Sequence, residues 1–419
     1  MSQAKNKSIN KKNPVQKAKQ QRQPSQPYTM LAPLTSAALT DKAARTSIGE
    51  KNIRDHEELV RVSSLLSATP GRIKGEQQSL SSWRKAVHQY ISHYNEAEVE
   101  QYSLVLLEKV RDQEHHSRLI NRLERVKERE LLRGAWPTNS ETKGELIRVH
   151  ESAEEVNLLL KLHIKKRMQQ NDIFYIEERF DYERLWLRQQ GEEWEIVQVE
   201  PVIYERRPRF GDAAHDTVWI DESDAVNSVM LTPSVPYLNY ELMAAYRPMR
   251  NQFIYKRDLA VAYADRWWNE GNPRYEQFEV NCTHYVSQCI FAGNAPMNYT
   301  GKRSSGWWYR GRDKGQELWS YSWAVSHAMN TYLAAARKSG LRAQMVSSAD
   351  QLSLGDVITY DWAGDGRFQH STIVTAFDAF GMPLVNANTV PSRHRYWDYS
   401  DSYAWTPNTQ YRFFHIISD

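Results

Sequence analysis

The spacing of apolar residues in residues 80–137 predicts helices. Apolar side chains recur every three to four positions after a candidate N-cap at Ser81 or Ser82: Trp83, Val87, Tyr90, Ile91 and Tyr94. Helical spacing resumes between Val99 and Leu132 on an otherwise charged surface. Gly134 and Pro137 then end the helical pattern, because glycine favours the left-handed conformation of a C-cap and proline cannot continue a helix.

The pattern next changes to alternation of apolar and polar residues, which is typical of half-buried strands. Four runs alternate in this way: residues 145–151, 154–167, 173–188 and 194–204. Asn171-Asp172 and Gly191 separate successive runs and favour tight turns. We therefore expect residues 80–205 to form a small α+β domain of helices and an antiparallel meander, whose alternating Lys, Arg and Glu face solvent.

The remaining segments differ in composition. Residues 1–28 are rich in Lys, Gln, Asn, Ser and Pro, which predicts a disordered arm. Residues 29–79 form a poorly defined helical segment, and the prolines and weak periodicity of residues 206–250 indicate a linker. Residues 251–419 hold nine of the 14 tryptophans and form a second domain, in which aromatic side chains pack a core or line a cleft.

Charge is unevenly distributed along the chain. The whole chain carries +3 and residues 1–40 carry seven basic residues and no acid, so the remainder carries −4. The folded domains therefore lack the basic surface that nucleic acid requires. Only the basic N-terminal arm is suited to contact an anionic surface.

Two cysteines in 419 residues exclude a disulfide-rich scaffold and zinc sites built from three or four cysteines. No completed set of metal ligands is present elsewhere, so we expect neither a metal nor a cofactor. No window offers the roughly 18 consecutive apolar residues of a spanning helix, and no secretory leader is evident at the start. We therefore expect a cytoplasmic protein without a membrane span.

Cys282 is the candidate nucleophile. The segment 281–293 has helical spacing and ends at Gly293, so Cys282 falls at the start of a helix. Unpaired backbone N–H groups and the positive end of the helix dipole stabilise a thiolate there, and the same N–H groups can bind an oxyanion. Cys289 lies two turns further on the packed face, and we interpret it as a small buried hydrophobic residue.

His370 is the candidate base. A strand is predicted over residues 357–360, and a glycine-rich turn leads into a second strand with His370 near its start. A third strand ends in Asn386 and Asn388, whose side chains share a face because strand residues alternate. A Cys at a helix start, a His at a strand start and a polar residue on the next strand are typical of papain-like thiol hydrolases.

Residues from about 250 to 418 contain an ordered set of motifs that resembles a known family. The motifs are Tyr255-Lys-Arg-Asp-Leu-Ala-Val-Ala-Tyr263-Ala264, Asn272-Pro273, Asn281-Cys-Thr-His-Tyr-Val-Ser-Gln-Cys289, Gly306-Trp-Trp-Tyr309, Ser322-Trp323, Gly355-Asp356 and His370-Ser371. This set resembles the putative amidase domain family of Bacillus-type, Gram-positive bacteria, which is placed near the NlpC/P60 and CHAP cysteine peptidases. The resemblance implies an α+β chain whose C-terminal domain has a papain-like, NlpC/P60-type fold.

The resemblance also implies roles for individual residues. Cys282 matches the nucleophile of the family and His370 matches its base. The third polar position, usually His in such members, is Asn388 here, and the choice between Asn388 and Asn386 as the third catalytic group stays open. His284 and Asn294 stand where Asn and Gly are expected.

We therefore predict a cysteine amidase or peptidase that hydrolyses a peptide amide bond through a thioester. By analogy with the family, the substrate is a peptide or a peptidoglycan-derived molecule such as a cell-wall stem peptide. Two alternatives stay open: thioester-mediated acyl transfer, and a non-catalytic binding module with an aromatic groove. Trp307, Trp308 and Trp323 are the candidate substrate-binding residues, with core packing as their other interpretation.

Overall fold

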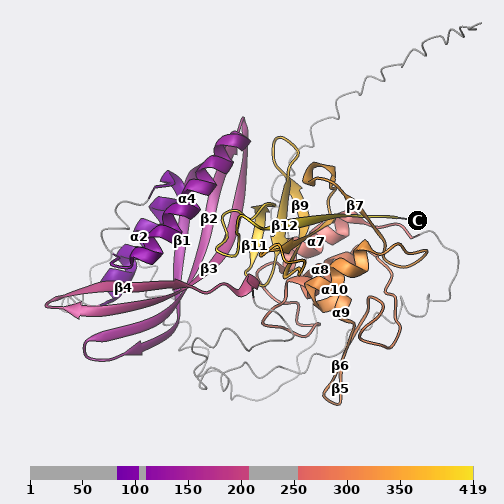
Figure 1. Cartoon of the computed structure of the whole chain (residues 1–419), viewed down its shortest axis with the longest axis horizontal. Helices are drawn as coiled ribbons and strands as arrows, with labels where there is room; N and C mark the ends of the chain where they lie inside the picture. The colour runs from indigo at the N-terminus through magenta and orange to yellow at the C-terminus, as the bar shows by residue number, and fades with distance from the viewer. Residues whose placement is uncertain (1–82, 103–109, 207–252, 419) are drawn as a thin grey trace, which may run out of the picture. The chain divides into compact units, whose positions relative to one another are not determined.

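A computed structural model describes residues 83–102, 110–206 and 253–418 of the chain (Figure 1). These residues lie in one compact unit, residues 74–419, with a mixed α+β architecture and a mostly antiparallel sheet. The predicted caps Ser81 and Ser82, the arm 1–28, the segment 29–79 and all but the first residue of the linker 206–250 lie outside the described residues.

Two helices and four strands form the first part of the structure. Helix α2 (Trp83–Glu100) and helix α4 (Gln113–Arg133) precede β1 (Ala135–Glu151), β2 (Glu155–Gln170), β3 (Ile173–Gln190) and β4 (Glu193–Pro201), and η1 (Tyr204–Arg206) follows. Asp112 caps α4 by accepting hydrogen bonds from the backbone of Glu114 and His115, and Gly134 ends α4 with φ 59°. The expected order of helices followed by an antiparallel meander is therefore present.

Strand β1 begins well before the predicted residue 145, directly after Gly134. Pro137 is compatible with this strand because β1 lies at the edge of the sheet, where a missing N–H breaks no ladder hydrogen bond. The register shifts between Pro137 and Asn139. Gly134 therefore ends the helix, and Pro137 is the third residue of a strand that begins directly after it.

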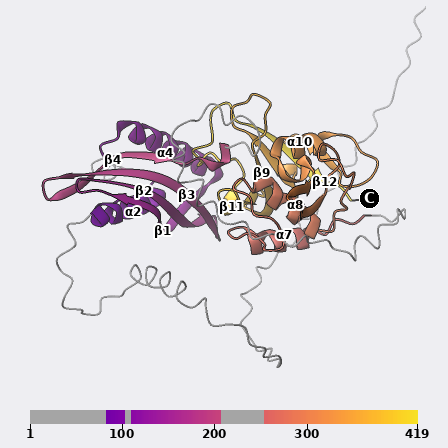
Figure 2. The ribbon, with the colours of Figure 1, turned by 90° about the horizontal axis from the view of Figure 1, so that it is seen from below.

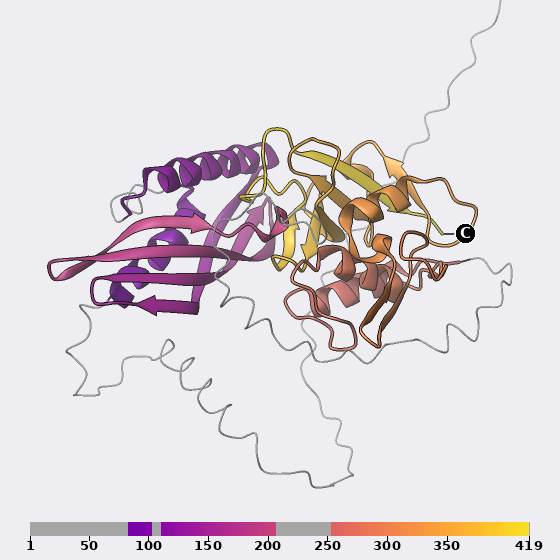
Figure 3. The same cartoon turned by 60° about the horizontal axis from the view of Figure 1, so that its bottom comes forward.

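Alternation along β2 determines which face of the meander is buried. Its even-numbered residues pack beneath α2 and α4, which lie against the sheet in Figures 1 and 3: Val156, Leu158, Leu160, Leu162 and Ile164. Its odd-numbered residues lie on the opposite face and keep part of their surface exposed. The helices thus cover one face of the meander only.

The second part holds the remaining helices and strands that the structure describes. They are α7 (Arg257–Trp267), α8 (Cys282–Ala292), β5 (Tyr309–Asp313), β6 (Gln316–Trp319), α9 (Tyr321–Ala324), α10 (Ser326–Ala334), β7 (Ala343–Val346), η2 (Ala349–Gln351), β8 (Val357–Asp361), β9 (His370–Phe377), β10 (Pro383–Ala387), β11 (Ser392–Tyr396) and β12 (Gln410–Ile416). Figure 2 shows α7, α8 and α10 beside β9 and β12. The three strands predicted around His370 correspond to β8, β9 and β10.

Apart from β5 and β6, which form a separate two-stranded sheet, the strands named above belong to one ten-stranded sheet. Its order is β1-β2-β3-β11-β10-β9-β8-β12-β7, and β4 pairs with β3. Strand β3 joins β11 through the antiparallel pairs Arg179–Ser392 and Glu178–Arg393. The sheet therefore continues from the meander into the second part without a break in pairing.

Two hydrophobic cores lie on opposite faces of β8 and β9, and they determine the surroundings of the candidate site. On one face, Val357 and Ile373 pack against the core of α8. On the other face, Ile358, Tyr360 and Val374 pack with rings from the chain that follows β8 and β11, including Trp362 and Tyr399. Neighbouring residues of β9 therefore contact different cores.

Among the described helices, none is long and apolar enough to cross a membrane. The described residues also contain no group of three or more His, Cys, Asp or Glu side chains placed to hold a metal ion.

Candidate active site

Cys282 is the first residue of α8, and its side chain is 2% exposed. Its Sγ faces the carbonyl oxygen of Gln369 at 4.0 Å and the hydroxyl of Thr283 at 3.8 Å. Gln369 directly precedes β9. The thiol therefore lies near the point where β9 begins, and Cys282 is at the helix start that the sequence pattern predicts.

Thr389, which follows β10, provides the cap of α8. Its Oγ1 accepts hydrogen bonds from the backbone N–H of Asn281 at 3.0 Å and of Cys282 at 2.7 Å. Asn281 itself makes no side-chain capping bond. The N–H of Cys282, one of the predicted oxyanion donors, thus already has a partner in this conformation.

Asn388 lies beside Cys282, but its contacts differ from the predicted ones. Its Oδ1 accepts a hydrogen bond from Asn281 Nδ2 at 2.6 Å, and its Nδ2 donates to the carbonyl oxygens of Trp267 and Trp268 at 3.0 and 2.8 Å. Asn388 therefore ties the end of α7 to the residue that precedes the nucleophile. The Oδ1 of Asn281 is buried and has no hydrogen-bond partner among the described residues.

Asn386, the other candidate for the third group, is also fully engaged. Its Nδ2 donates to Asp265 on α7 at 3.0 Å, and its Oδ1 accepts from the Thr375 hydroxyl at 2.8 Å and from the backbone of His394 at 2.9 Å. Asn386 contacts α7 and Asn388 contacts the end of α7, but β10 ends at Ala387, so Asn388 lies just after the strand on which it was expected. Neither of them has a described contact with His370.

His370 is fully buried at the first position of β9, and its ring lies on the face opposite to α8. The ring packs against Tyr360, Trp362 and Tyr399, with centroid distances of 5.4, 5.8 and 5.2 Å. Both ring nitrogens are buried without a hydrogen-bond partner in the described structure. No described contact joins the ring to Cys282.

Burial is the main cause that lowers the pKa of His370 to about 3, and the positive charge of Arg395 acts in the same direction. The imidazole is therefore neutral near pH 7, with one nitrogen carrying a proton and the other free to accept one. A general base must begin in this neutral state. Its present position, however, does not put it within hydrogen-bond reach of the thiol.

The residue after His370 faces α8 instead and belongs to a buried cluster of hydroxyls. Ser371 Oγ lies 3.1 Å from Thr283 Oγ1 and 2.9 Å from Ser326 Oγ. Ser326 also donates to the carbonyl oxygen of His370 at 2.8 Å. The sequence analysis did not identify this cluster, although Thr283 and Ser371 directly follow the two candidate catalytic residues.

The structure places the three candidate substrate-binding tryptophans in the core. Trp307, Trp308 and Trp323 are at most 2% exposed. Their indole N–H groups donate to Ser287 Oγ at 3.0 Å, to the carbonyl oxygen of Ser305 at 3.0 Å and to His284 Nδ1 at 2.7 Å, respectively. Their second interpretation, core packing, matches this burial, and in this conformation they offer no open groove.

Cys289 is completely buried in the core around α8, as the sequence analysis expects. Burial raises the pKa of its thiol well above the ordinary value, so Cys289 stays protonated. It provides a matched control for experiments on Cys282.

Comparisons with known proteins show what the second part of the chain is similar to. Residues 254–414 match the family model described as "Putative amidase domain". The uncharacterized protein YhbB of Bacillus subtilis (strain 168) is 54% identical over 167 residues, which are 40% of this chain and 52% of that protein. The chain thus spans about half the length of this relative. The family match confirms the resemblance of residues 254–414 to the amidase domain.

Among solved structures, the intermembrane space region of chloroplast protein ARC6 matches 32% of this chain and 98% of its own, at 12% identity and a TM-score of 0.21. A likeness at this TM-score carries no argument about the fold or function of this chain.

Proposed function

We propose that this protein is a cysteine amidase or peptidase that cleaves a peptide amide bond with Cys282 as the nucleophile. The observation that carries the proposal is the position of Cys282, as the first residue of α8, inside the segment that matches the amidase family. The helix dipole favours a negative charge on sulfur at this position. A thiolate is the nucleophilic form of cysteine, so the position suits attack on a carbonyl carbon.

We propose His370 as the base that takes the proton of Cys282. The thiol lies 4.0 Å from the carbonyl oxygen of Gln369, which is one residue from His370. For proton transfer, the imidazole has to leave the rings of Tyr360, Trp362 and Tyr399 and move to the α8 side of the sheet. The buried ring makes no described hydrogen bond, but His370 pairs with Tyr360 in the sheet and its carbonyl oxygen accepts from Ser326, so the movement also has to change the backbone at the start of β9. Leaving the apolar surroundings would also raise the affinity of the imidazole for a proton.

The proposed reaction then follows thiol-hydrolase chemistry. The imidazole takes the thiol proton, and the sulfur forms a bond to the carbonyl carbon. The tetrahedral intermediate collapses when the carbon–nitrogen bond breaks and the imidazolium protonates the leaving amine. Water, activated by the neutral imidazole, hydrolyses the thioester to a carboxylic acid and returns the thiol. Acyl transfer would differ only in the acceptor that replaces water.

The contacts of Asn388 support a different role from orientation of the imidazole. Through Asn281 it holds the residue before the nucleophile and ties it to the end of α7. We therefore propose Asn388 as a residue that positions Cys282. The papain-like fold and the cell-wall stem peptide as substrate remain parts of the proposal that rest on the family resemblance, whereas the cytoplasmic location remains an expectation from the sequence pattern.

Two observations favour a second candidate, a non-catalytic binding module. The ring of His370 faces away from α8, and the N–H of Cys282 already donates a hydrogen bond to Thr389. If this conformation is permanent, Cys282 has neither a base nor this oxyanion donor. Labelling with iodoacetamide near neutral pH separates the two candidates, because the enzyme should show faster modification of Cys282 than of Cys289.

Hydrolysis of simple peptide amides and muropeptides by the full chain tests the proposal. We expect Cys282→Ala to abolish release of the amine and Cys289→Ala to retain it. Loss of activity in Cys289→Ala with activity retained in Cys282→Ala would overturn the assignment. Analysis of the products in the presence of an added amine acceptor distinguishes hydrolysis from acyl transfer.

A further inference from the structure

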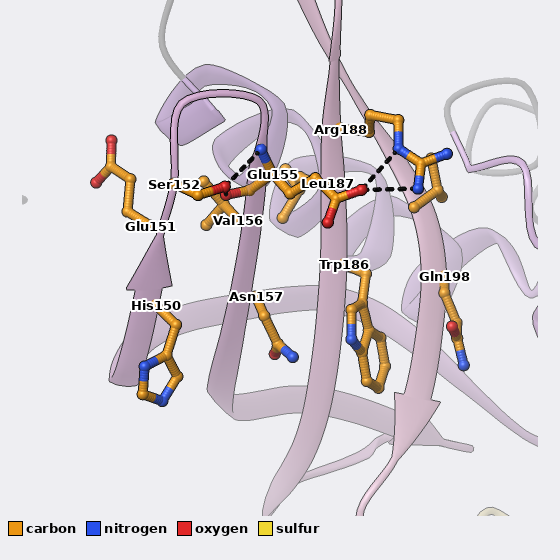
Figure 4. Close-up of a pocket in the computed structure, with 11 residues that line it drawn as sticks. His150, Glu151, Ser152, Glu155, Val156, Asn157, Trp186, Leu187, Arg188 and Gln198 are labelled. Atoms are coloured by element: carbon orange, nitrogen blue, oxygen red, sulfur yellow. Dashed lines mark hydrogen bonds and ion pairs between the residues drawn. The ribbon is translucent and has the colours of Figure 1, made fainter.

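The uncovered face of the meander carries a row of hydrogen-bonding side chains that the proposed amidase chemistry does not use. His150 on β1 pairs with Asn157 on β2, Asn157 with Trp186 on β3, and Trp186 with Gln198 on β4. Directly paired residues of an antiparallel sheet point to the same face. Figure 4 shows the four side chains projecting in the same direction, one from each strand. With neighbouring strands about 4.8 Å apart, the row spans about 14 Å.

None of these four side chains makes a hydrogen bond with another residue that the structure describes. His150 and Gln198 are exposed, and Asn157 and Trp186 are partly exposed. Their counterparts on neighbouring positions point the other way: Val156 and Leu187 are buried beneath the helices. The strands therefore hold the row on a rigid support, and its polar atoms are available to a ligand.

The row borders a hollow of about 440 Å³ at the β1–β2 hairpin. Ser152, at the turn of that hairpin, accepts a hydrogen bond from the backbone of Glu155. Glu155 pairs with Arg188 at 2.7 Å, and the carboxylate of Glu151 also lines the hollow (Figure 4). The lining therefore holds no positive charge in excess. The row itself carries no acid, lysine or arginine. A neutral ligand matches this distribution of charge.

We propose that this row binds a neutral saccharide chain. The face of an indole ring carries partial negative charge, and it attracts the polarised C–H groups on the flat side of a pyranose ring. The side chains of Asn157 and Gln198, on either side of Trp186, each offer donors and an acceptor, which suits hydroxyl and acetamido groups. His150 extends the same line by one more strand. A short oligosaccharide lying across the strands can therefore stack on Trp186 and bond to its neighbours.

Single-stranded nucleic acid is the competing ligand, because its bases also stack on aromatic side chains. It requires cations that follow the backbone phosphates. The cation that lines the hollow, Arg188, is paired with Glu155. The saccharide is therefore the ligand that the observations favour, and an oligonucleotide serves as the comparison in the test.

Isothermal titration of the full-length Cys282→Ala protein tests the proposal without hydrolysis. The probes are a β-1,4-linked N-acetylglucosamine oligomer, a β-1,4-linked glucose oligomer and a single-stranded oligonucleotide. We expect binding of at least one saccharide probe and weaker binding of the oligonucleotide. Preference between the two saccharides reports whether the amide side chains recognise acetamido groups. Binding of neither saccharide, or tighter binding of the oligonucleotide, would contradict the proposal.

Variants locate the site. We expect Trp186→Ala to weaken saccharide binding by at least about tenfold, because one stacked ring is lost. Trp136→Ala is the matched control, since Trp136 is an exposed tryptophan near the other end of β1, and it should change the affinity less than twofold. Asn157 is partly exposed, so Asn157→Ala provides a second measurement of saccharide affinity if Trp186→Ala fails to fold. Two results would show that the ligand binds elsewhere. One is an equal loss of saccharide affinity in Trp186→Ala and Trp136→Ala, and the other is an unchanged affinity in both Trp186→Ala and Asn157→Ala. Because catalysis is absent from the assay, failure of the amidase proposal leaves this result unaffected.

Discussion

At the scale of single residues, the imidazole of His370 is the group that packing explains least. It is completely buried, and its two nitrogens have no hydrogen-bond partner among the described residues. A buried polar atom without a partner costs about 1–3 kcal/mol of stability, and such atoms often mark functional positions. His370 is therefore expected to serve activity at the expense of stability.

Replacing His370 with Phe tests this expectation. The variant keeps a ring among Tyr360, Trp362 and Tyr399 and removes the unpartnered nitrogens. We expect a free energy of unfolding equal to that of the wild type or higher by about 1 kcal/mol, together with amidase activity at least about 100-fold lower. Urea unfolding and amine release measure the two effects. Full activity in the variant would show that His370 is not the base.

The same pair of proteins should differ in how acid affects them. The folded chain protonates His370 only near pH 3, whereas the unfolded chain does so near its ordinary value of 6.5. The contribution of the neutral ring is therefore complete above pH 6.5 and is lost as the pH falls to about 3. We expect the wild type to lose up to about 1.4 kcal/mol per pH unit relative to His370→Phe in this window. A constant difference between the two proteins would contradict the buried, neutral imidazole.

At the scale of elements, the start of α8 depends on a residue from another part of the chain. Thr389 accepts the hydrogen bonds of the first backbone N–H groups, a role that an N-cap side chain usually performs. The helix that positions Cys282 is thus held by the segment that follows β10.

Replacing Thr389 with Val should weaken this connection. The methyl group has a similar volume but accepts no hydrogen bond, so we expect a loss of about 1 kcal/mol in the free energy of unfolding. Thr389→Ser keeps the hydroxyl and should retain most of the stability. Urea unfolding of both variants measures the difference. A loss in Thr389→Ser without a loss in Thr389→Val would show that the methyl group, not the hydroxyl, is important.

Sequence patterns predicted well which segments form helices and strands. They predicted less well on which face of the sheet a side chain lies. The helix from Cys282 to Ala292 and the strands around His370 follow from apolar spacing and glycine turns. In β9, however, Ile373 and Val374 are both apolar and pack into different cores. With two buried faces, the pattern has no period that reveals the face of His370. The hydrogen bonds of Asn388 to α7 are long-range contacts that apolar spacing does not report.

At the scale of the whole molecule, a buried cluster of charges joins the meander to the second part. We refer to the following residues as the arginine–carboxylate cluster: Glu98, Arg122, Arg129, Arg179, Arg395 and Asp401. Asp401 contacts Arg129, Arg179 and Arg395, which come from α4, β3 and β11. Burial opposes its ionisation, but these positive charges hold the pKa of Asp401 well below its ordinary value. Sequence patterns suggested a solvated charged surface for the meander, whereas several of these side chains are buried between the two parts.

Removing Asp401 should destabilise the protein strongly. Asp401→Ala leaves buried arginines without their shared partner, so we expect a loss of about 3–5 kcal/mol in the free energy of unfolding. Glu270→Ala is the matched control, because Glu270 forms an exposed ion pair with Arg266 and should cost less than about 1 kcal/mol. Chemical denaturation compares the variants. Similar effects of the two substitutions would mean that the cluster does not join the two parts.

The pairing of β3 with β11 has a consequence for how this amidase segment can be used. Residues 254–414 match a family model on their own, but in this chain the open side of β11 is completed by Arg179 and Glu178. Taken out of this chain, that segment would expose unpaired backbone groups along β11, and Asp401 would lose its contacts with Arg129 and Arg179. Such an edge recruits strands from other molecules. Grafting the segment onto another protein therefore requires a substitute for β3, or a redesigned β11 that repels neighbouring chains.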